Sequence, residues 1–157
     1  MQNWKLLAVL FAASLLGCES AGRSGDMCTL IGCIDGLSID FTRTSWPVGS
    51  YSVQVIQDGK PAATCMAKLP FEPSGSAGQC DATNLTLGTS GQALPASQQA
   101  LTGLRINGTP TKVQIVMLRN GALELSTEVT PTYQTSTPNG AKCGPTCTQS
   151  HVKIAIP

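Results

Sequence analysis

Apolar and polar residues alternate along several short stretches of this chain, with the period of a β-strand. The alternation is present at 37–42, 51–55, 84–87, 123–126 and 151–156. Since successive side chains of a strand point to opposite faces, each stretch would bury one set of side chains and leave the other in water. After residue 27, no stretch shows the spacing of an amphipathic helix. The pattern therefore predicts an all-β domain.

Turn residues support this prediction. Asp58-Gly59 and Asn120-Gly121 each stand between two apolar runs, and such pairs suit the positive φ angles of a type I′ hairpin. The segment 91–101 is the exception and would hold one helical turn after Pro95. About seven or eight short strands favour an antiparallel β-sandwich, immunoglobulin-like or transthyretin-like, with a small barrel as the alternative. Trp46 would pack at one end of the sandwich.

The N-terminal segment has a different pattern. Lys5 precedes an apolar run from Leu6 to Leu16, which is too short for a membrane-spanning helix of about 20 residues but fits the core of a secretory signal. The run ends in Leu15-Leu16-Gly17-Cys18, which resembles the lipobox of bacterial lipoproteins. An ordinary signal peptide followed by an unrelated cysteine is the alternative.

The lipobox resemblance implies that diacylglycerol is attached to Cys18 and that the chain is cut just before it. Residues 1–17 are then a signal peptide, the small polar residues 18–27 a flexible tether, and 28–157 a single β-sandwich domain. In lipoproteins of two-membrane bacteria, Asp after the cysteine tends to retain the protein in the inner membrane. Glu19 therefore implies the outer membrane, on its periplasmic or surface face.

Beyond Cys18, the chain has an even number of cysteines, which favours disulfides outside the cytoplasm. Cys65 and Cys80 flank a loop rich in Gly, Pro and Ser, and their pairing would close it. The others form two close pairs near the ends of the domain, which either bond locally or clamp the two ends together. We favour the clamp, because it constrains more of the unfolded chain. The six expected disulfide cysteines are Cys28, Cys33, Cys65, Cys80, Cys143 and Cys147.

Two other uses of these cysteines are weaker. Cys143 and Cys147 resemble a redox pair, but three residues separate them where the thioredoxin motif has two, and the βαβ context is missing. Cys28, Cys33, Cys143 and Cys147 have spacings that zinc tolerates, but an oxidising compartment argues against a thiolate site.

The remaining composition narrows the function further. The net charge is +1 and aromatic residues make up 4% of the chain, which argues against charge-driven nucleic-acid binding and against a large stacking platform for bases or sugars. The lone His151 is expected on the solvated face of a strand. Asp35, Asp40 and Asp58 would bind calcium if they met, but turn chemistry also explains Asp35 and Asp58. We expect no catalytic residue, metal or cofactor.

The pattern from Gly49 to Gly59, together with the late Cys-Gly-Pro-Thr-Cys, resembles small envelope lipoproteins of the myxobacterial type. That resemblance supports the location and the architecture but implies no activity. The sequence thus predicts a non-enzymatic module, anchored in the membrane by lipid, that binds another envelope protein or a surface ligand. The candidate binding loops are 68–78 and 130–142, and the alternative is a small periplasmic thiol-disulfide or other enzyme using Cys143 and Cys147.

Overall fold

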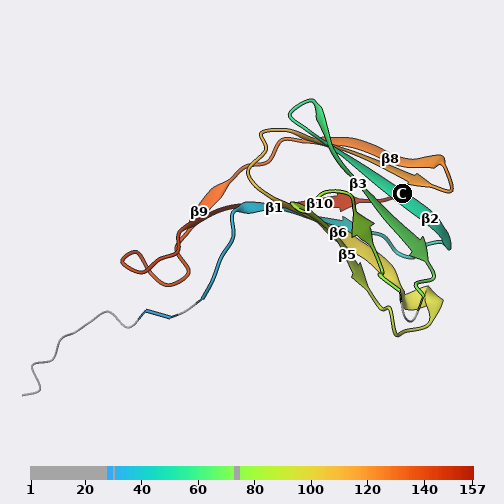
Figure 1. Cartoon of the computed structure of the whole chain (residues 1–157), viewed down its shortest axis with the longest axis horizontal. Coiled ribbons are helices and arrows are strands. Elements are labelled where there is room, and N and C mark those ends of the chain that lie inside the picture. The colour runs from blue at the N-terminus through green and yellow to red at the C-terminus, as the bar shows by residue number, and fades with distance from the viewer. Residues whose placement is uncertain (1–27, 30, 73–74) are drawn as a thin grey trace, which may run out of the picture.

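The computed structural model describes residues 28–29, 31–72 and 75–157, which form two β-sheets packed face to face (Figure 1). The expected signal peptide, Cys18 and the tether lie outside these described residues. None of the residues that the structure describes belongs to a helix that could span a lipid bilayer.

Each sheet has five strands. Sheet A has the order β5-β6-β1-β10-β9, and sheet B has the order β4-β3-β2-β7-β8. The predicted disulfide-stapled β-sandwich is confirmed. The elements are β1 (Gly36–Thr42), β2 (Gly49–Gln57), β3 (Lys60–Leu69), β4 (Gln79–Cys80), β5 (Leu85–Ser90), the 3-10 turn η1 (Ala96–Gln98), β6 (Ala100–Asn107), β7 (Val113–Arg119), β8 (Ala122–Val129), β9 (Gln134–Ser136) and β10 (Cys147–Ala155).

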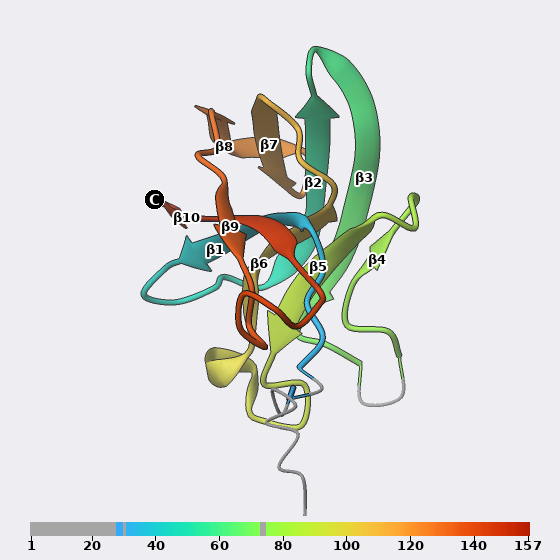
Figure 2. The ribbon, with the colours of Figure 1, turned by 90° about the vertical axis from the view of Figure 1, so that its left-hand side faces the viewer.

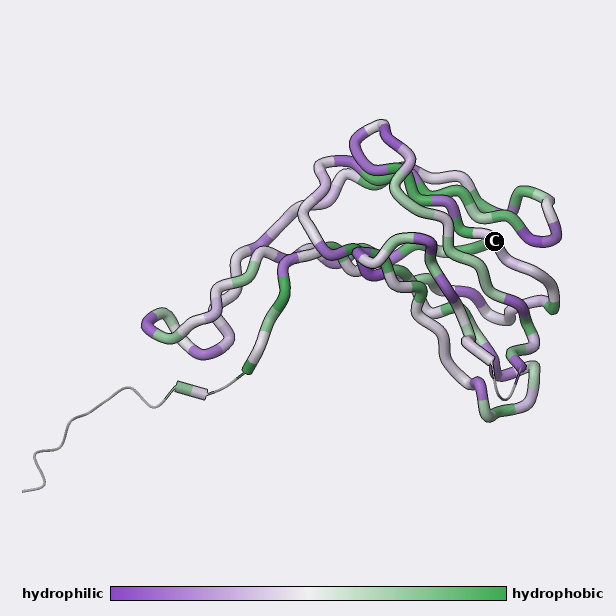
Figure 3. Tube along the Cα trace, in the orientation of Figure 1, coloured by the Kyte–Doolittle hydropathy of each residue, from purple (hydrophilic) through white to green (hydrophobic). Residues whose placement is uncertain are grey.

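One core lies between the sheets, and the alternation along the strands fills it. Leu37 and Ile39 of β1 face inward from sheet A, while Val53 and Val55 of β2 face inward from sheet B, and all four are almost fully buried. Each such side chain contributes roughly 1.5–3 kcal/mol through burial. Figure 3 shows the corresponding alternation of hydropathy along the strands, with hydrophilic residues at the hairpin tips.

The structure differs from the predicted sandwich in one pairing. β1 runs parallel to β10, with Gly36 opposite Gln149 and Thr42 opposite Ala155, whereas every other pair of strands in the described residues is antiparallel. The first and the last long strands are therefore neighbours inside sheet A. Alternation predicts which face a residue occupies, but it does not predict which strand lies beside it.

The sequence pattern did not predict strand β6. It did predict the single helical turn that precedes this strand, which is η1. Gly88 pairs with Gly103, and Thr89 pairs with Leu101, so Thr102 is an extra residue in β6. Such a bulge shifts the alternation by one position. Leu101 and Leu104 are consequently both buried although three positions separate them, and the period of two is lost.

Both predicted Asx-Gly hairpins are present. Asp58 and Gly59 have φ angles of 50° and 78°, and Asn120 and Gly121 have φ angles of 51° and 82°, as a type I′ turn requires. The side chain of each Asx residue also bonds to the neighbouring strand end. Asn120 Oδ1 accepts a hydrogen bond of 2.8 Å from the Ser50 backbone N–H. The two hairpins therefore fasten each other across the β2–β7 pair.

Asp58 makes the more extensive of these contacts. Its Oδ1 accepts hydrogen bonds from the Thr111 hydroxyl at 2.6 Å and from the backbone N–H groups of Thr111 and Lys112 at 3.0 Å. The hydroxyl bond from Thr111 is the main reason that the pKa of the Asp58 carboxyl lies below its ordinary value. The ionised carboxylate thus holds the turn against the loop that leads into β7.

Trp46 is buried at one end of the sandwich, as predicted. Its ring meets Tyr51 edge to face at a centroid distance of 5.6 Å, and the Arg43 guanidinium lies 5.5 Å from the Trp46 ring centroid. Glu124 is the extra residue of a bulge in β8 and pairs with Arg119 at 2.6 Å and with Arg43 at 2.8 Å. Chiefly through the Arg119 hydrogen bond, this pairing lowers the pKa of Glu124 and closes this end of the core.

The lowered pKa of Asp58 makes stability depend on pH. The contribution of this carboxylate is fully present above the pKa of the unfolded chain, about 3.9, and is lost as the pH falls through the lower folded pKa. Asp58→Asn keeps a residue that tolerates positive φ but removes the charge. We expect the variant to unfold at lower urea concentration than the parent at pH 6, with the gap narrowing toward pH 2. A gap that is constant over this range would contradict the assigned role.

Candidate functional site

Two long-range disulfides join the segment before β1 to the segment before and at the start of β10. Cys28 bonds to Cys143 and Cys33 bonds to Cys147, with Cα–Cα distances of 5.7 and 5.9 Å and sequence separations of 115 and 114. Of the two pairings left open by the sequence, the clamp is therefore correct. We call these two disulfides the cystine clamp.

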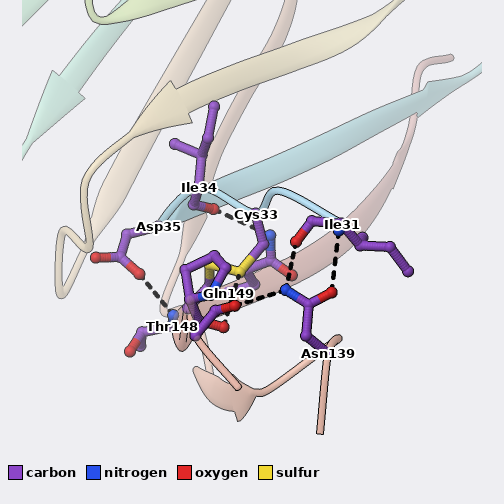
Figure 4. Close-up of a disulfide and its surroundings, with 10 residues drawn as sticks. Ile31, Cys33, Ile34, Asp35, Asn139, Thr148 and Gln149 are labelled. Atoms are coloured by element: carbon purple, nitrogen blue, oxygen red, sulfur yellow. Dashed lines mark hydrogen bonds between the residues drawn. A yellow bond between two sulfur atoms is a disulfide. The ribbon is translucent and has the colours of Figure 1, made fainter. Parts of the chain in front are cut away.

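Hydrogen bonds reinforce the cystine clamp (Figure 4). The Asn139 side chain accepts from the Ile31 N–H at 3.0 Å and donates to the carbonyl oxygens of Ile31 at 2.9 Å and Gly144 at 2.7 Å. Asp35 Oδ1 accepts a bond of 2.6 Å from the Thr148 N–H, and Gln149 Nε2 donates to the Ile34 carbonyl at 3.0 Å. These side-chain hydrogen bonds thus extend the contact between the two segments beyond the start of β1.

The third disulfide joins Cys65 to Cys80, as predicted. These residues are direct partners in the β3–β4 pair, and their Cα atoms are 3.9 Å apart. The bond closes the predicted loop 68–78, whose residues Lys68, Glu72, Gly75 and Ser76 border a hollow of about 360 Å³ on sheet B. Residues 73–74 of this loop lie outside the described residues.

The pairing bears on the two other uses considered for the cysteines. A thiol-disulfide enzyme would exchange a bond between Cys143 and Cys147. Each of these sulfurs is instead bonded to a cysteine in the segment before β1. The same bonds leave no thiolate to ligate zinc. Within residues 28–29, 31–72 and 75–157, no group of three His, Cys, Asp or Glu side chains is placed to hold a metal ion.

The three aspartates considered for calcium have separate partners. Asp35 accepts from the Thr148 N–H, Asp58 accepts from Thr111, and Asp40 contacts His151. Because each carboxylate is used in its own part of the fold, they form no shared set of oxygen ligands.

A polar hollow of the outer surface lies on sheet A, where β1, β6 and β10 meet the segment that leads into β9. Figure 2, viewed from the side of β9, shows β9 beside β10, and β10 separates it from β1 in the strand order of sheet A. We call this hollow the sheet A groove. It has a volume of about 600 Å³ and is lined by Gly36, Ser38, Arg105, Thr132, Gln134, Thr135, Ser136, Gln149, Ser150 and His151.

Strand register brings the floor of the groove together. Ser38 is the partner of Arg105 in the β1–β6 pair and of His151 in the β1–β10 pair. These three residues therefore form a row across three neighbouring strands, with roughly 4.8 Å between strands. Gly36 is the neighbouring position to Ser38 on the same face of β1. It has no side chain, so the floor of the groove beside the row is formed by backbone.

The charges in the row are unevenly paired. His151 Nε2 lies 2.7 Å from Asp40 Oδ2, which occupies the next outward position of β1. Arg105 is exposed and forms neither an ion pair nor a side-chain hydrogen bond with any other described residue. Asp40, a carboxylate of this face, is thus engaged by His151, and no side chain of the described residues pairs with the guanidinium of Arg105.

The row contains a hydroxyl, an imidazole and a carboxylate, but their contacts do not activate a nucleophile. A serine nucleophile needs a hydrogen bond to its base, and Ser38 Oγ makes no side-chain hydrogen bond within the described part of the chain. The imidazole instead contacts Asp40 through Nε2. The arrangement is suited to holding a polar ligand.

The sequence located part of this site. The predicted loop 130–142 supplies one wall through Thr132, Gln134, Thr135 and Ser136, and His151 lies on the exposed face of its strand as expected. Arg105 was missed because it lies in the unpredicted strand β6. The contact between Asp40 and His151 was missed because it depends on the parallel pairing of β1 with β10.

No protein-family model, curated protein or solved structure matches this chain. A function must therefore be inferred from the side chains of the groove and from the motif Leu15-Leu16-Gly17-Cys18.

The two bonds of the cystine clamp should act together. When both disulfides are formed, one of them is enough to close the long loop. The other then closes only a short ring made of residues 28–33 and 143–147. In the chain-entropy model, removing one bond costs about 3 kcal/mol, and removing the second costs a further 4–5 kcal/mol or so. We expect Cys33→Ala with Cys147→Ala to stay folded, and the variant lacking all four clamp cysteines to be largely unfolded.

Urea denaturation of the purified protein measures these losses. Cys65→Ala with Cys80→Ala is the matched control, because it opens a separate loop. It should cost about 3 kcal/mol both in the parent and in the variant that lacks only Cys33 and Cys147. A four-cysteine clamp variant as stable as the parent would contradict the role of the cystine clamp.

Proposed function

We propose that this chain is a lipid-anchored module of the cell envelope that binds another envelope component or a surface ligand and carries out no catalysis. The observation that carries the binding role is a polar groove in which Arg105 has no partner, and no nucleophile contacts a base, among the residues that the structure describes. Binding sites commonly combine such loops with a rigid frame, and here the cystine clamp holds the frame.

The anchor is proposed on the Leu15-Leu16-Gly17-Cys18 motif. In this proposal Cys18 carries diacylglycerol, and Glu19 directs the protein to the outer membrane. Several acyl chains on one cysteine provide stable attachment, because each buried methylene contributes about 0.8 kcal/mol. Disulfides between distant cysteines agree with an oxidising compartment outside the cytoplasm.

Two variants test the anchor. Cys18→Ser should remain uncut and without acyl label, and it should leave the outer-membrane fraction, because the lipid has no attachment point. Glu19→Asp is the matched control, since it keeps Cys18 and should keep the label while moving toward the inner membrane. Radiolabelled palmitate, intact mass and density-gradient fractionation measure these outcomes. If Cys18→Ser still takes the acyl label, or fractionates with the outer membrane like the parent, the lipid anchor is refuted.

The binding role predicts a neighbour at the groove. A photo-crosslinking amino acid at Thr132, an exposed residue of the groove wall, should capture a defined envelope component in intact cells. The same group at Lys60, the exposed first residue of β3, is the control and should capture none. The adducts are compared by gel electrophoresis and mass spectrometry. Equal capture at both positions, or none at Thr132, would overturn the binding role of the groove.

A further inference from the structure

We propose that the sheet A groove binds an acidic saccharide, a hydroxyl-rich molecule that carries a carboxylate, sulfate or phosphate group. This assignment rests on the proposed binding function and names the chemistry of its ligand. It follows from the charge, the hydrogen-bonding groups, the size and the lining of the groove.

The charge of the groove favours an anion. Arg105 is its permanent cation, and no carboxylate is among the residues that line it. Asp40, on the same face, is already 2.7 Å from His151. Lys153 is the partner of Asp40 in the β1–β10 register and lies on the same face, but it is not among the residues that line the groove. A guanidinium offers a planar fork of donors that matches a carboxylate, sulfate or phosphate, so an oxyanion is the group that Arg105 would bind.

The other lining groups favour a ligand with many hydroxyls. Besides Arg105, five exposed or half-buried lining side chains make no hydrogen bond with another described residue. A hydroxyl both donates and accepts, and a primary amide offers both kinds of group, so such side chains match sugar hydroxyls. The five are Ser38, Thr132, Gln134, Thr135 and Ser136.

The size and the lining residues of the groove favour an acidic saccharide over other ligands. Its volume of about 600 Å³ lies within the usual range for small ligands, about 300–1,000 Å³. No aromatic or large aliphatic side chain lines it, so it offers neither a pocket for the apolar anchors of a peptide nor a ring on which a neutral sugar could stack. Recognition must then depend on hydrogen bonds and on the charge of Arg105.

The test uses the full chain with its disulfides intact, purified from the cells that produce it. A glycan array with equal numbers of acidic and neutral glycans gives the first measurement, and the acidic glycans should be the ones bound. Calorimetry with trigalacturonate and with its methyl ester then isolates the charge, because the two probes share the same ring hydroxyls. We expect the acid to bind at least about tenfold more tightly than the ester.

Arg105→Gln should abolish this preference by weakening the binding of the acid about tenfold or more, since its charge-assisted hydrogen bonds are lost. Lys153→Gln is the matched control, because it removes an equal charge from the same face outside the groove, and it should change affinity less than about threefold. Near-ultraviolet circular dichroism confirms that both variants remain folded.

Binding of neutral glycans only, binding of acidic peptides in their place, no bound glycan, or unchanged binding by Arg105→Gln would each overturn the assignment. None of these results affects the crosslink from Thr132 or the label on Cys18, so a wrong ligand class is distinguished from a wrong function. If the crosslink from Thr132 also fails, the binding function fails with it.

Discussion

The rest of the structure depends on the bonding of the first strand to the last. β1 lies between β6 and β10 in sheet A, and both neighbours come from the second half of the sequence. The cystine clamp fixes this arrangement at the point where β1 and β10 begin, by closing loops of 114 and 115 residues. Closing a loop of this length removes roughly 4.7 kcal/mol of chain entropy from the unfolded state, which is a large part of the stability of an ordinary domain.

The groove is a product of the same constraint. Its row of Arg105, Ser38 and His151 exists only because β6, β1 and β10 lie side by side in this register. Its wall reaches β10 through three residue pairs, from Gln134 with Gln149 to Ser136 with Cys147. Cys147 is itself bonded to Cys33, so the wall, the floor and the start of β1 are tied at one place. The surface proposed for recognition therefore rests on the most strongly crosslinked part of the fold.

Local features of this fold could be predicted from the sequence, and features that depend on distant neighbours could not. Alternation located β1, β2 and β10, and the positive φ of Asp58 and Asn120 followed from turn chemistry. The bulge at Thr102 concealed β6, because one extra residue breaks the period. The pairing of the cysteines was only a preference, since spacing alone permits local bonds. Arg105 and the contact between Asp40 and His151 needed the strand order, which no local pattern contains.

The clamp also determines how the domain carries a mechanical load. Tension applied at Cys28 passes through covalent bonds to Cys143, and from Cys33 to Cys147, before it reaches the interior of either strand. Because β1 and β10 run in the same direction, they are loaded in parallel from the same end. Neither strand can be peeled from the other one hydrogen bond at a time. A pull on the N-terminal side therefore displaces the domain as a unit and leaves its surface intact.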